Sequence, residues 1–215
     1  MKPPIASALI LAAGLLSGCT SVRAVRQADP APNAYSARVH LPSDLRRVVV
    51  LPVTCDNTPD AEVGRDALQP VLLAELTKVN AFEVVPISPD QLRAVTGKSR
   101  WEATELLPPD LFSRLHAATG CDAVLFCRLK QFRAYPPLSV GWDLRLVEVN
   151  QRSVLWAVDQ VFDAGKTEVA SAAQRYYARS EERSATIADP ESVLMSPRLF
   201  GQYAAAASLA VLPAH

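Results

Sequence analysis

Two apolar runs of strand length constrain the fold more than any other feature of this 215-residue chain. The first is Val48–Val53, and the second lies within Asp122–Leu129. Continuous runs of this kind are typical of strands buried on both faces, as in parallel sheets that helices cover. Pro52 suits the end of the first strand, because proline has no N–H to donate to a neighbouring strand. The two runs therefore predict a helix-covered sheet with parallel strands.

Helical patterns lie between these two runs. Apolar residues recur at helical spacing from Leu68 to Val79, and a short strand is predicted at Phe82–Pro86. A helix is expected to start after Ser88, because Ser-Pro-Asp-Gln combines an N-cap, a proline at the first helical position and a capping glutamine. Another helix is expected to end at Gly120.

The second half of the chain adds a hairpin. Trp142–Val149 and Val154–Phe162 place apolar residues on one face, and the short gap between them predicts an antiparallel pair. Helices are expected at Val169–Ala178 and from Ser196 onward. The predicted fold class is α/β, with a mixed sheet of about five strands flanked by helices. A parallel β-α-β-α-β core places the first strand next to the second and third, and the C-terminal hairpin extends one edge.

The N-terminus has the pattern of a secretory signal. Lys2 precedes the apolar run Ile5–Leu16. As a helix this run spans about 18 Å, which is short of a bilayer core of about 30 Å. The run ends in Leu16-Ser17-Gly18-Cys19, which resembles the bacterial lipobox. That resemblance implies cleavage before Cys19 and lipidation of its thiol, and Thr20 in place of aspartate implies an outer-membrane address. The alternative is an ordinary signal peptide with a chance cysteine.

Three segments are therefore expected. Residues 1–18 are the lipoprotein signal peptide, and residues 19–44 are the lipidated cysteine with a flexible tether. Within it, Thr20–Pro42 contains prolines and has no apolar periodicity, and fully extended this stretch reaches about 75 Å. Residues 45–215 form a single α/β periplasmic domain with C-terminal helices. The acyl chains provide the membrane anchor.

Several strand motifs together resemble a known superfamily. They are Val49-Val50-Leu51-Pro52-Val53, Phe82-Glu83-Val84-Val85, Gly120-Cys121-Asp122-Ala123-Val124-Leu125, Asp143-Leu144-Arg145-Leu146-Val147-Glu148-Val149 and Ser153-Val154-Leu155-Trp156-Ala157. The chain resembles periplasmic lipoproteins that include CsgG-like curli-secretion proteins, LpoB-like activators of penicillin-binding proteins and the TolB N-terminal domain. The resemblance implies a non-enzymatic, lipid-anchored protein that binds or assembles another envelope component.

A CsgG-like oligomeric secretion component in the outer membrane is the alternative within this superfamily. Such a pore needs transmembrane hairpins with lipid-facing alternation. Residues 133–141 and 164–195 are too short, too polar or too alanine-rich to supply both hairpins. The sequence therefore favours an interaction protein and leaves its oligomeric state open.

Composition and motifs argue against other classes. The 22 basic and 22 acidic side chains leave no basic excess for binding nucleic acid. Three dispersed histidines, His40, His116 and His215, form no metal or catalytic motif. Thr96-Gly97-Lys98-Ser99 resembles the end of a phosphate-binding loop, but Leu92 occupies the position of the first glycine. We therefore expect no catalytic residue, no metal and no cofactor.

A small-molecule-binding or hydrolytic periplasmic domain is the remote alternative. Asp143, Glu148 and Asp159 can approach one another across the hairpin, although an exposed charged face explains them more simply. A deep polar pocket with convergent carboxylates would support this alternative.

Two further sites are suggested. Cys55 follows the first strand and Cys127 lies in the third, its expected neighbour, so a Cys55–Cys127 disulfide is conceivable in an oxidising compartment. Buried free thiols are the alternative, and they are commoner in such strands. An aromatic and proline-rich loop before the fourth strand is either a partner contact or a local packing feature; it contains Phe132, Tyr135, Pro136 and Pro137.

Overall fold

The computed structural model describes residues 33–181 and 190–215. The predicted signal peptide, Cys19 and the first part of the predicted tether lie outside the described residues. In the part of the chain that is described, none of the helices has the length and apolar character needed to cross a membrane.

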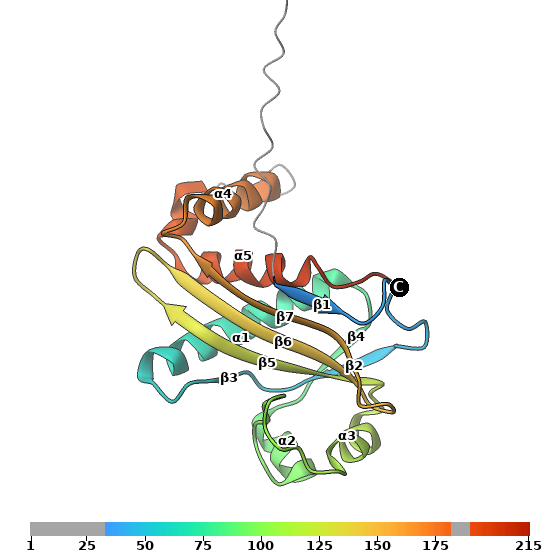
Figure 1. Cartoon of the computed structure of the whole chain (residues 1–215). Helices are drawn as coiled ribbons and strands as arrows, with labels where there is room; N and C mark the ends of the chain where they lie inside the picture. The colour runs from blue at the N-terminus through green and yellow to red at the C-terminus, as the bar shows by residue number, and fades with distance from the viewer. Residues whose placement is uncertain (1–32, 182–189) are drawn as a thin grey trace, which may run out of the picture.

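A mixed seven-stranded sheet forms the centre of the molecule (Figure 1). The strands lie in the order β1-β7-β6-β5-β2-β4, and β3 pairs with β5. β2 is parallel to both β4 and β5, and β3 is parallel to β5, whereas β5, β6, β7 and β1 pair antiparallel. The strands are β1 (Ala34–Ser36), β2 (Arg47–Val50), β3 (Thr54–Cys55), β4 (Glu83–Pro86), β5 (Ala123–Arg133), β6 (Ser139–Glu148) and β7 (Val154–Asp163).

The predicted α/β fold is confirmed, including the position of β2 between β4 and β5 and the antiparallel β6–β7 hairpin. The sheet has two more strands than expected, β1 and β3, which are too short to carry an alternating pattern.

The folded part also begins before the predicted boundary at residue 45. β1 lies within the predicted tether and pairs with β7: Ala37 N donates to Leu155 O at 3.0 Å, and Asp159 N donates to Asn33 O at 2.9 Å. Leu41, also in that segment, is buried in the core. Backbone pairing and burial of one leucine therefore order a segment whose polar composition suggested a tether.

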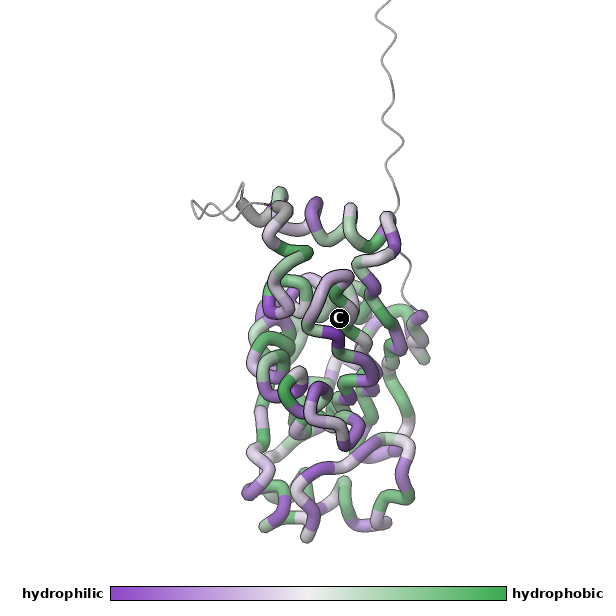
Figure 2. Tube along the Cα trace, turned by 90° about the vertical axis from the view of Figure 1, so that its left-hand side faces the viewer, coloured by the Kyte–Doolittle hydropathy of each residue, from purple (hydrophilic) through white to green (hydrophobic). Residues whose placement is uncertain are grey.

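Helices cover the two faces of the sheet unequally (Figure 1). α1, α4 and α5 pack on one face, and α2 and α3 cover one end of the other. Seen from the side in Figure 2, α4 lies at one end of the molecule, and the end that carries α2 and α3 lies opposite. The helices are α1 (Pro59–Val79), α2 (Pro89–Thr96), α3 (Leu111–Thr119), α4 (Thr167–Glu181), the 3-10 helix η1 (Pro190–Leu194) and α5 (Pro197–Leu209).

Local signals explain the ends of α2. Ser88 and Gln91 form the expected capping box, which satisfies backbone N–H groups at the helix start. Gly97 ends the helix with φ 85°, a left-handed conformation that favours glycine, and its N–H donates to Arg93 O. The segment that resembled a phosphate-binding loop is therefore a helix C-cap.

Two apolar cores result from this layering. The larger lies between the sheet and α1, α4 and α5, and it contains Trp142, Trp156, Phe162 and Phe200. The smaller lies between the sheet and α2 and α3, and Phe126 packs there edge-to-face on Phe112. Because α2 and α3 are short, the smaller core ends where β5, β6 and β7 continue, and the rest of that sheet face is left without a helix over it in the described chain.

Candidate functional site

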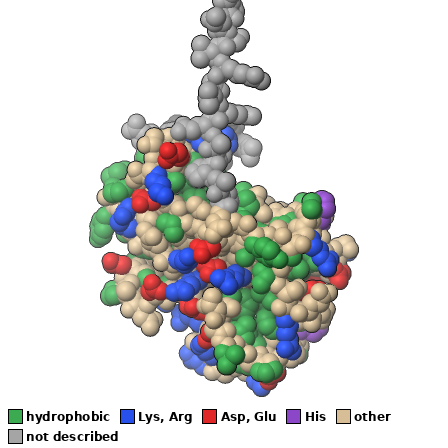
Figure 3. Space-filling model, viewed as in Figure 1, with side chains coloured by type: hydrophobic (Ala, Val, Ile, Leu, Met, Phe, Trp, Pro, Cys, Tyr) green, Lys and Arg blue, Asp and Glu red, His purple; other side chains and the backbone are tan. Residues whose placement is uncertain are grey.

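The uncovered part of the sheet carries a group of charged side chains. The register aligns Arg128 of β5, Asp143 of β6 and Asp159 of β7 in one row across the sheet. Figure 3 shows acidic and basic side chains gathered in the middle of this side of the molecule, over β5 to β7. We call this surface the open face, and its residues are Tyr35, Arg128, Lys130, Asp143, Arg145, Ala157 and Asp159.

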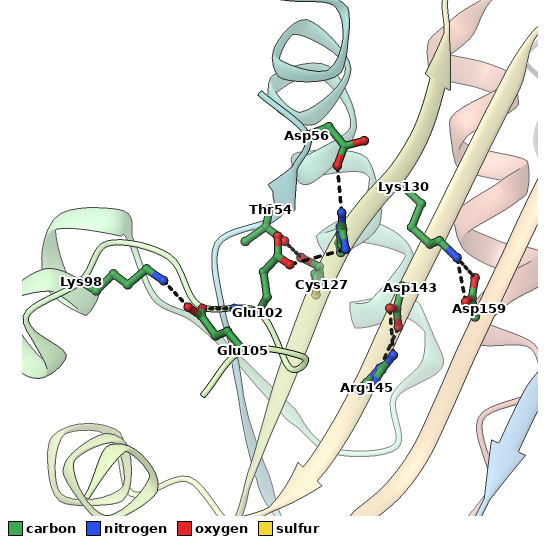
Figure 4. Close-up of polar contacts among 11 residues, drawn as sticks. Thr54, Asp56, Lys98, Glu102, Glu105, Cys127, Lys130, Asp143, Arg145 and Asp159 are labelled. Carbon is green, nitrogen blue, oxygen red and sulfur yellow. Dashed lines mark hydrogen bonds and ion pairs between the residues drawn. The ribbon is translucent and has the colours of Figure 1, made fainter. Parts of the chain in front are cut away.

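Asp143 and Asp159 lie directly opposite each other on the β6–β7 pair. Like charges at such positions destabilise a sheet unless other groups compensate them. Arg145 Nε and Nη2 donate to the two Asp143 oxygens at 3.0 and 3.2 Å, and Lys130 Nζ lies 2.6 and 2.7 Å from the two Asp159 oxygens (Figure 4). Each carboxylate therefore has its own cation, and the two do not form a free acid–base pair.

Arg128 joins the open face to the neighbouring loops. Its guanidinium lies 2.8 Å from an Asp56 oxygen and 3.5 Å from a Glu102 oxygen (Figure 4). The hydrogen bond to Asp56 raises the pKa of Arg128 above its ordinary value, against the opposing effect of burial. These contacts hold the charged groups in fixed positions at the surface.

A groove of about 430 Å³ lies between β1 and the β6–β7 pair. It is lined by Asn33, Ala34, Tyr35, Asp143, Arg145, Val154, Ala157, Val158 and Asp159. Tyr35 is half-exposed, so the groove combines an aromatic ring with fixed charges. These lining residues include no histidine, cysteine or serine for general acid–base or nucleophilic chemistry.

Other polar residues singled out in the sequence lie elsewhere. Glu148 accepts a 3.4 Å hydrogen bond from Ser153 beside the hairpin turn. His116 Nδ1 lies 2.8 Å from Cys121 O, which ties the end of α3 to the start of β5. Among the described residues, no three His, Cys, Asp or Glu side chains are arranged to hold a metal ion.

The predicted contact loop divides into two environments. Phe132 is partly buried against α1, where a Cβ added to Gly64 would lie 2.3 Å from its Cγ. Phe132 is thus a packing residue. Tyr135 at the hairpin tip is 78% exposed, and the Pro136–Pro137 bond beside it is cis. A contact role for Tyr135, Pro136 and Pro137 stays a prediction.

The Cys55–Cys127 disulfide is not formed: Cys55, Cys121 and Cys127 are free thiols. Cys55 pairs with Leu129, two residues beyond Cys127 on β5. Strand spacing and rise place the Cys55 and Cys127 Cα atoms roughly 8 Å apart, beyond the limit of about 7 Å for a disulfide. The strands are neighbours as expected, but their register separates the two cysteines.

Thiol labelling should separate the three cysteines. Burial raises the pKa of all three thiols, but Cys121 and Cys127 are buried whereas Cys55 is only partly buried, so Cys55 is the thiol that a reagent can reach. We expect native protein at pH 8 to be alkylated at Cys55 alone, and all three thiols to react after unfolding. Peptide mass spectrometry without reduction measures this, and a pair of cysteines that stays unlabelled after unfolding would contradict it.

The open face is the feature that the sequence only half indicated. The alternation of Asp143 with Arg145 marked a charged strand face; Arg145 is partly exposed there, whereas the Asp143 side chain is only 11% exposed. Tyr35 was missed because it lies in the segment predicted as a tether. The pairing of Arg128 with Glu102 carries no sequence signal, because the two residues are brought together only by folding.

A mixed α/β sheet flanked by helices on both faces, with one face partly open and charged, defines the class to which this chain belongs. No protein-family profile matches the chain, and no curated protein does. Among solved structures, it matches the PelC dodecamer from Paraburkholderia phytofirmans with a TM-score of 0.47 and 14% identity, over 86% of this chain and 99% of that one.

Two further matches are lipoproteins or their domains. A lipoprotein from Neisseria meningitidis matches with a TM-score of 0.42 and 18% identity, over 65% of this chain and 99% of that one. The LpoB C-terminal domain from Salmonella enterica matches with a TM-score of 0.35 and 12% identity, over 64% and 88%. One group named by the sequence resemblance is thus among these matches, and at such similarity none of them assigns a function.

Proposed function

We propose that this chain is a non-enzymatic lipoprotein, anchored in the outer membrane through Cys19, that binds another envelope protein as LpoB-like activators or assembly factors do. The lipobox-like motif supports the anchor. The open face carries the proposal of binding, because it is a preorganised surface that none of the described helices covers. Arginine and tyrosine side chains are favoured in interfaces, and paired surface charges select and steer partners.

The arrangement gives a simple mechanism. The lipid holds the chain at the membrane, and the segment between Cys19 and Asn33 sets how far the domain reaches. Tethering confines the domain near membrane-associated partners, so that its effective concentration compensates for a modest affinity. Fixed ion pairs on the open face reduce the entropy that these side chains lose on binding.

Photocrosslinking in cells tests this proposal. A photoreactive residue at Tyr35 or Ala157 is expected to trap one envelope protein, identified by mass spectrometry. The same residue at Asp90, which is exposed on α2 away from the open face, is the matched control. Equal capture at Asp90, or no capture at Tyr35 and Ala157, would contradict the proposal. Capture of a second copy of this chain would instead support the oligomeric alternative.

Charge reversal provides a second measurement. We expect Arg145→Glu to reduce the crosslink at Tyr35 about tenfold, which corresponds to roughly 1.4 kcal/mol, because it leaves Asp143 without its cation and repels an acidic partner group. Arg114→Glu removes a more exposed ion pair, with Asp110 at the N-cap of α3, and serves as the control for a charge reversal outside the open face. Equal crosslinking in both variants would show that Arg145 is not part of the interface.

A further inference from the structure

Glu75 is a buried carboxylate that the proposed function does not use. It lies on α1 with only 5% of its surface exposed, where α1 meets α4 and α5. A buried charge is costly unless ionic and hydrogen-bonding partners compensate it. The partners of Glu75 therefore show which elements this carboxylate joins.

Three helices contribute these partners. Lys78 Nζ on α1 lies 2.5 Å from Glu75 Oε1, and Gln202 Nε2 on α5 donates to the same oxygen at 2.8 Å. The Tyr176 hydroxyl on α4 donates to Glu75 Oε2 at 3.4 Å. Burial, together with the neighbouring Glu75 charge, raises the pKa of Tyr176 to about 12, so its hydroxyl stays a donor at neutral pH.

A second route connects Glu75 to α4 through Gln202. The Tyr177 hydroxyl lies 2.9 Å from Gln202 Oε1 and 2.9 Å from Leu199 O, and its single proton serves one acceptor at a time. Because Gln202 Nε2 is directed at Glu75, its Oε1 is the atom that faces Tyr177. The Glu75 carboxylate therefore orients the Gln202 amide so that the amide oxygen faces the Tyr177 hydroxyl of α4.

The apolar contacts of α4 depend mainly on two tyrosines, Tyr176 and Tyr177. Its other buried residues are Val169, Ala172 and Ala173, and such small side chains bury little apolar area. Under α4 lies an aromatic cluster centred on Tyr203 of α5. The Tyr203 ring is 5.6 Å from the Phe162 ring, 5.8 Å from the Phe200 ring and 6.0 Å from the Tyr176 ring.

We propose that α4 can detach from the domain as a unit and that the contacts of Glu75 with Lys78, Gln202 and Tyr176 hold it in place. We call this set of contacts the latch. When the latch contact is lost, α4 leaves the body as a unit and uncovers the aromatic cluster. Such local opening lies below global unfolding in free energy, and hydrogen exchange measures it directly. The sheet stays folded during this motion, because α1, α5 and the part of the larger core between them and the sheet remain in place.

Hydrogen exchange of Glu75→Gln tests the latch. The variant keeps the size of the side chain but removes the charge that Lys78, Gln202 and Tyr176 contact. We expect amide exchange in Thr167–Ala178 to accelerate at least tenfold while exchange in β5 and β6 is unchanged, and we expect increased fluorescence of a hydrophobic dye. Glu62→Gln on the exposed side of the same helix, 4.0 Å from Arg65, is the control and should change neither measurement.

The alternative outcomes are distinct. Equal acceleration in α4 and in the central strands would mean that Glu75 stabilises the whole domain, and no acceleration would mean that it does not hold α4; both would overturn the proposal. If Glu75→Gln fails to fold, Tyr176→Phe removes only the hydroxyl contact. It should accelerate exchange in the same segment to a smaller extent, and unchanged exchange would again overturn the latch.

Discussion

Replacement of Cys19 by alanine is expected to move the protein entirely from the membrane fraction to the soluble fraction of the envelope. The proposed acyl chains each contribute about 0.8 kcal/mol per buried CH₂, and several chains together make anchoring durable. Membrane fractionation and the intact mass of the purified protein measure the effect, since loss of the lipid lowers the mass by the acyl and glyceryl groups.

Cys55→Ser is the matched control for this prediction, because it removes a cysteine that lies in the folded domain rather than in the lipobox-like motif. It should leave both fractionation and lipid mass unchanged. A Cys19→Ala protein that still sediments with membranes would show that another contact holds the chain there. If Cys19 of the parent protein carries no lipid, the N-terminus is an ordinary signal peptide with a chance cysteine.

Trp156→Ala is expected to lower the free energy of unfolding by about 3–5 kcal/mol, the usual cost of deleting a large aromatic side chain from a core. Trp156 is 1% exposed and lies opposite Leu146 in the β6–β7 pair. Its Nε1 also donates to Val211 O at 3.2 Å, which ties β7 to the segment after α5. Since a domain of this size has a total stability of about 5–15 kcal/mol, this one change removes a large fraction of it.

Urea denaturation of the lipid-free protein, followed by far-ultraviolet circular dichroism, measures this loss. Val154→Ala on the same strand is the control, because Val154 is 36% exposed and its truncation leaves no buried cavity. We expect its cost to stay below about 1 kcal/mol. A cost for Trp156→Ala as small as that of Val154→Ala would mean that the larger core does not depend on this side chain.

The two predictions concern separate parts of the proposed function. The proposed Cys19 anchor decides where the domain is held, whereas Trp156 helps to keep β7 in the sheet that forms the open face. Because Asp159 and Ala157 lie on the same strand as Trp156 with side chains on the opposite face, packing in the larger core positions the surface on the other side. Loss of Trp156 should therefore weaken partner binding as well as stability.

Local patterns were sufficient to predict most of the elements. The apolar run that contains Val48–Val50 predicted a strand buried on both faces, and β2 is such a strand, because Val48 and Val50 lie in the larger core and Val49 in the smaller. The capping box at Ser88 marked the start of α2 correctly. These predictions succeeded because side-chain alternation, helical periodicity and caps depend on residues close together in the chain.

The features that the sequence did not predict depend on contacts between distant segments. The predicted Cys55–Cys127 bridge was wrong. That two strands are neighbours does not specify their register, and the register separates these two cysteines by two residues. Glu75 and Lys78 have the spacing of an ordinary surface ion pair, and only the packing of α4 and α5 buries the carboxylate.

The sequence by itself determined the α/β class and the order of the main strands, and it predicts a lipid anchor at Cys19, because each depends on a local pattern. Only the tertiary structure decided that β1 joins the sheet, that Tyr35 lies beside Asp143 and Arg145, and that Glu75 joins three helices. The physical reason is that backbone pairing and burial depend on residues far apart in the chain, as in the hydrogen bond from Leu41 N to Ala214 O, and no local pattern records those contacts.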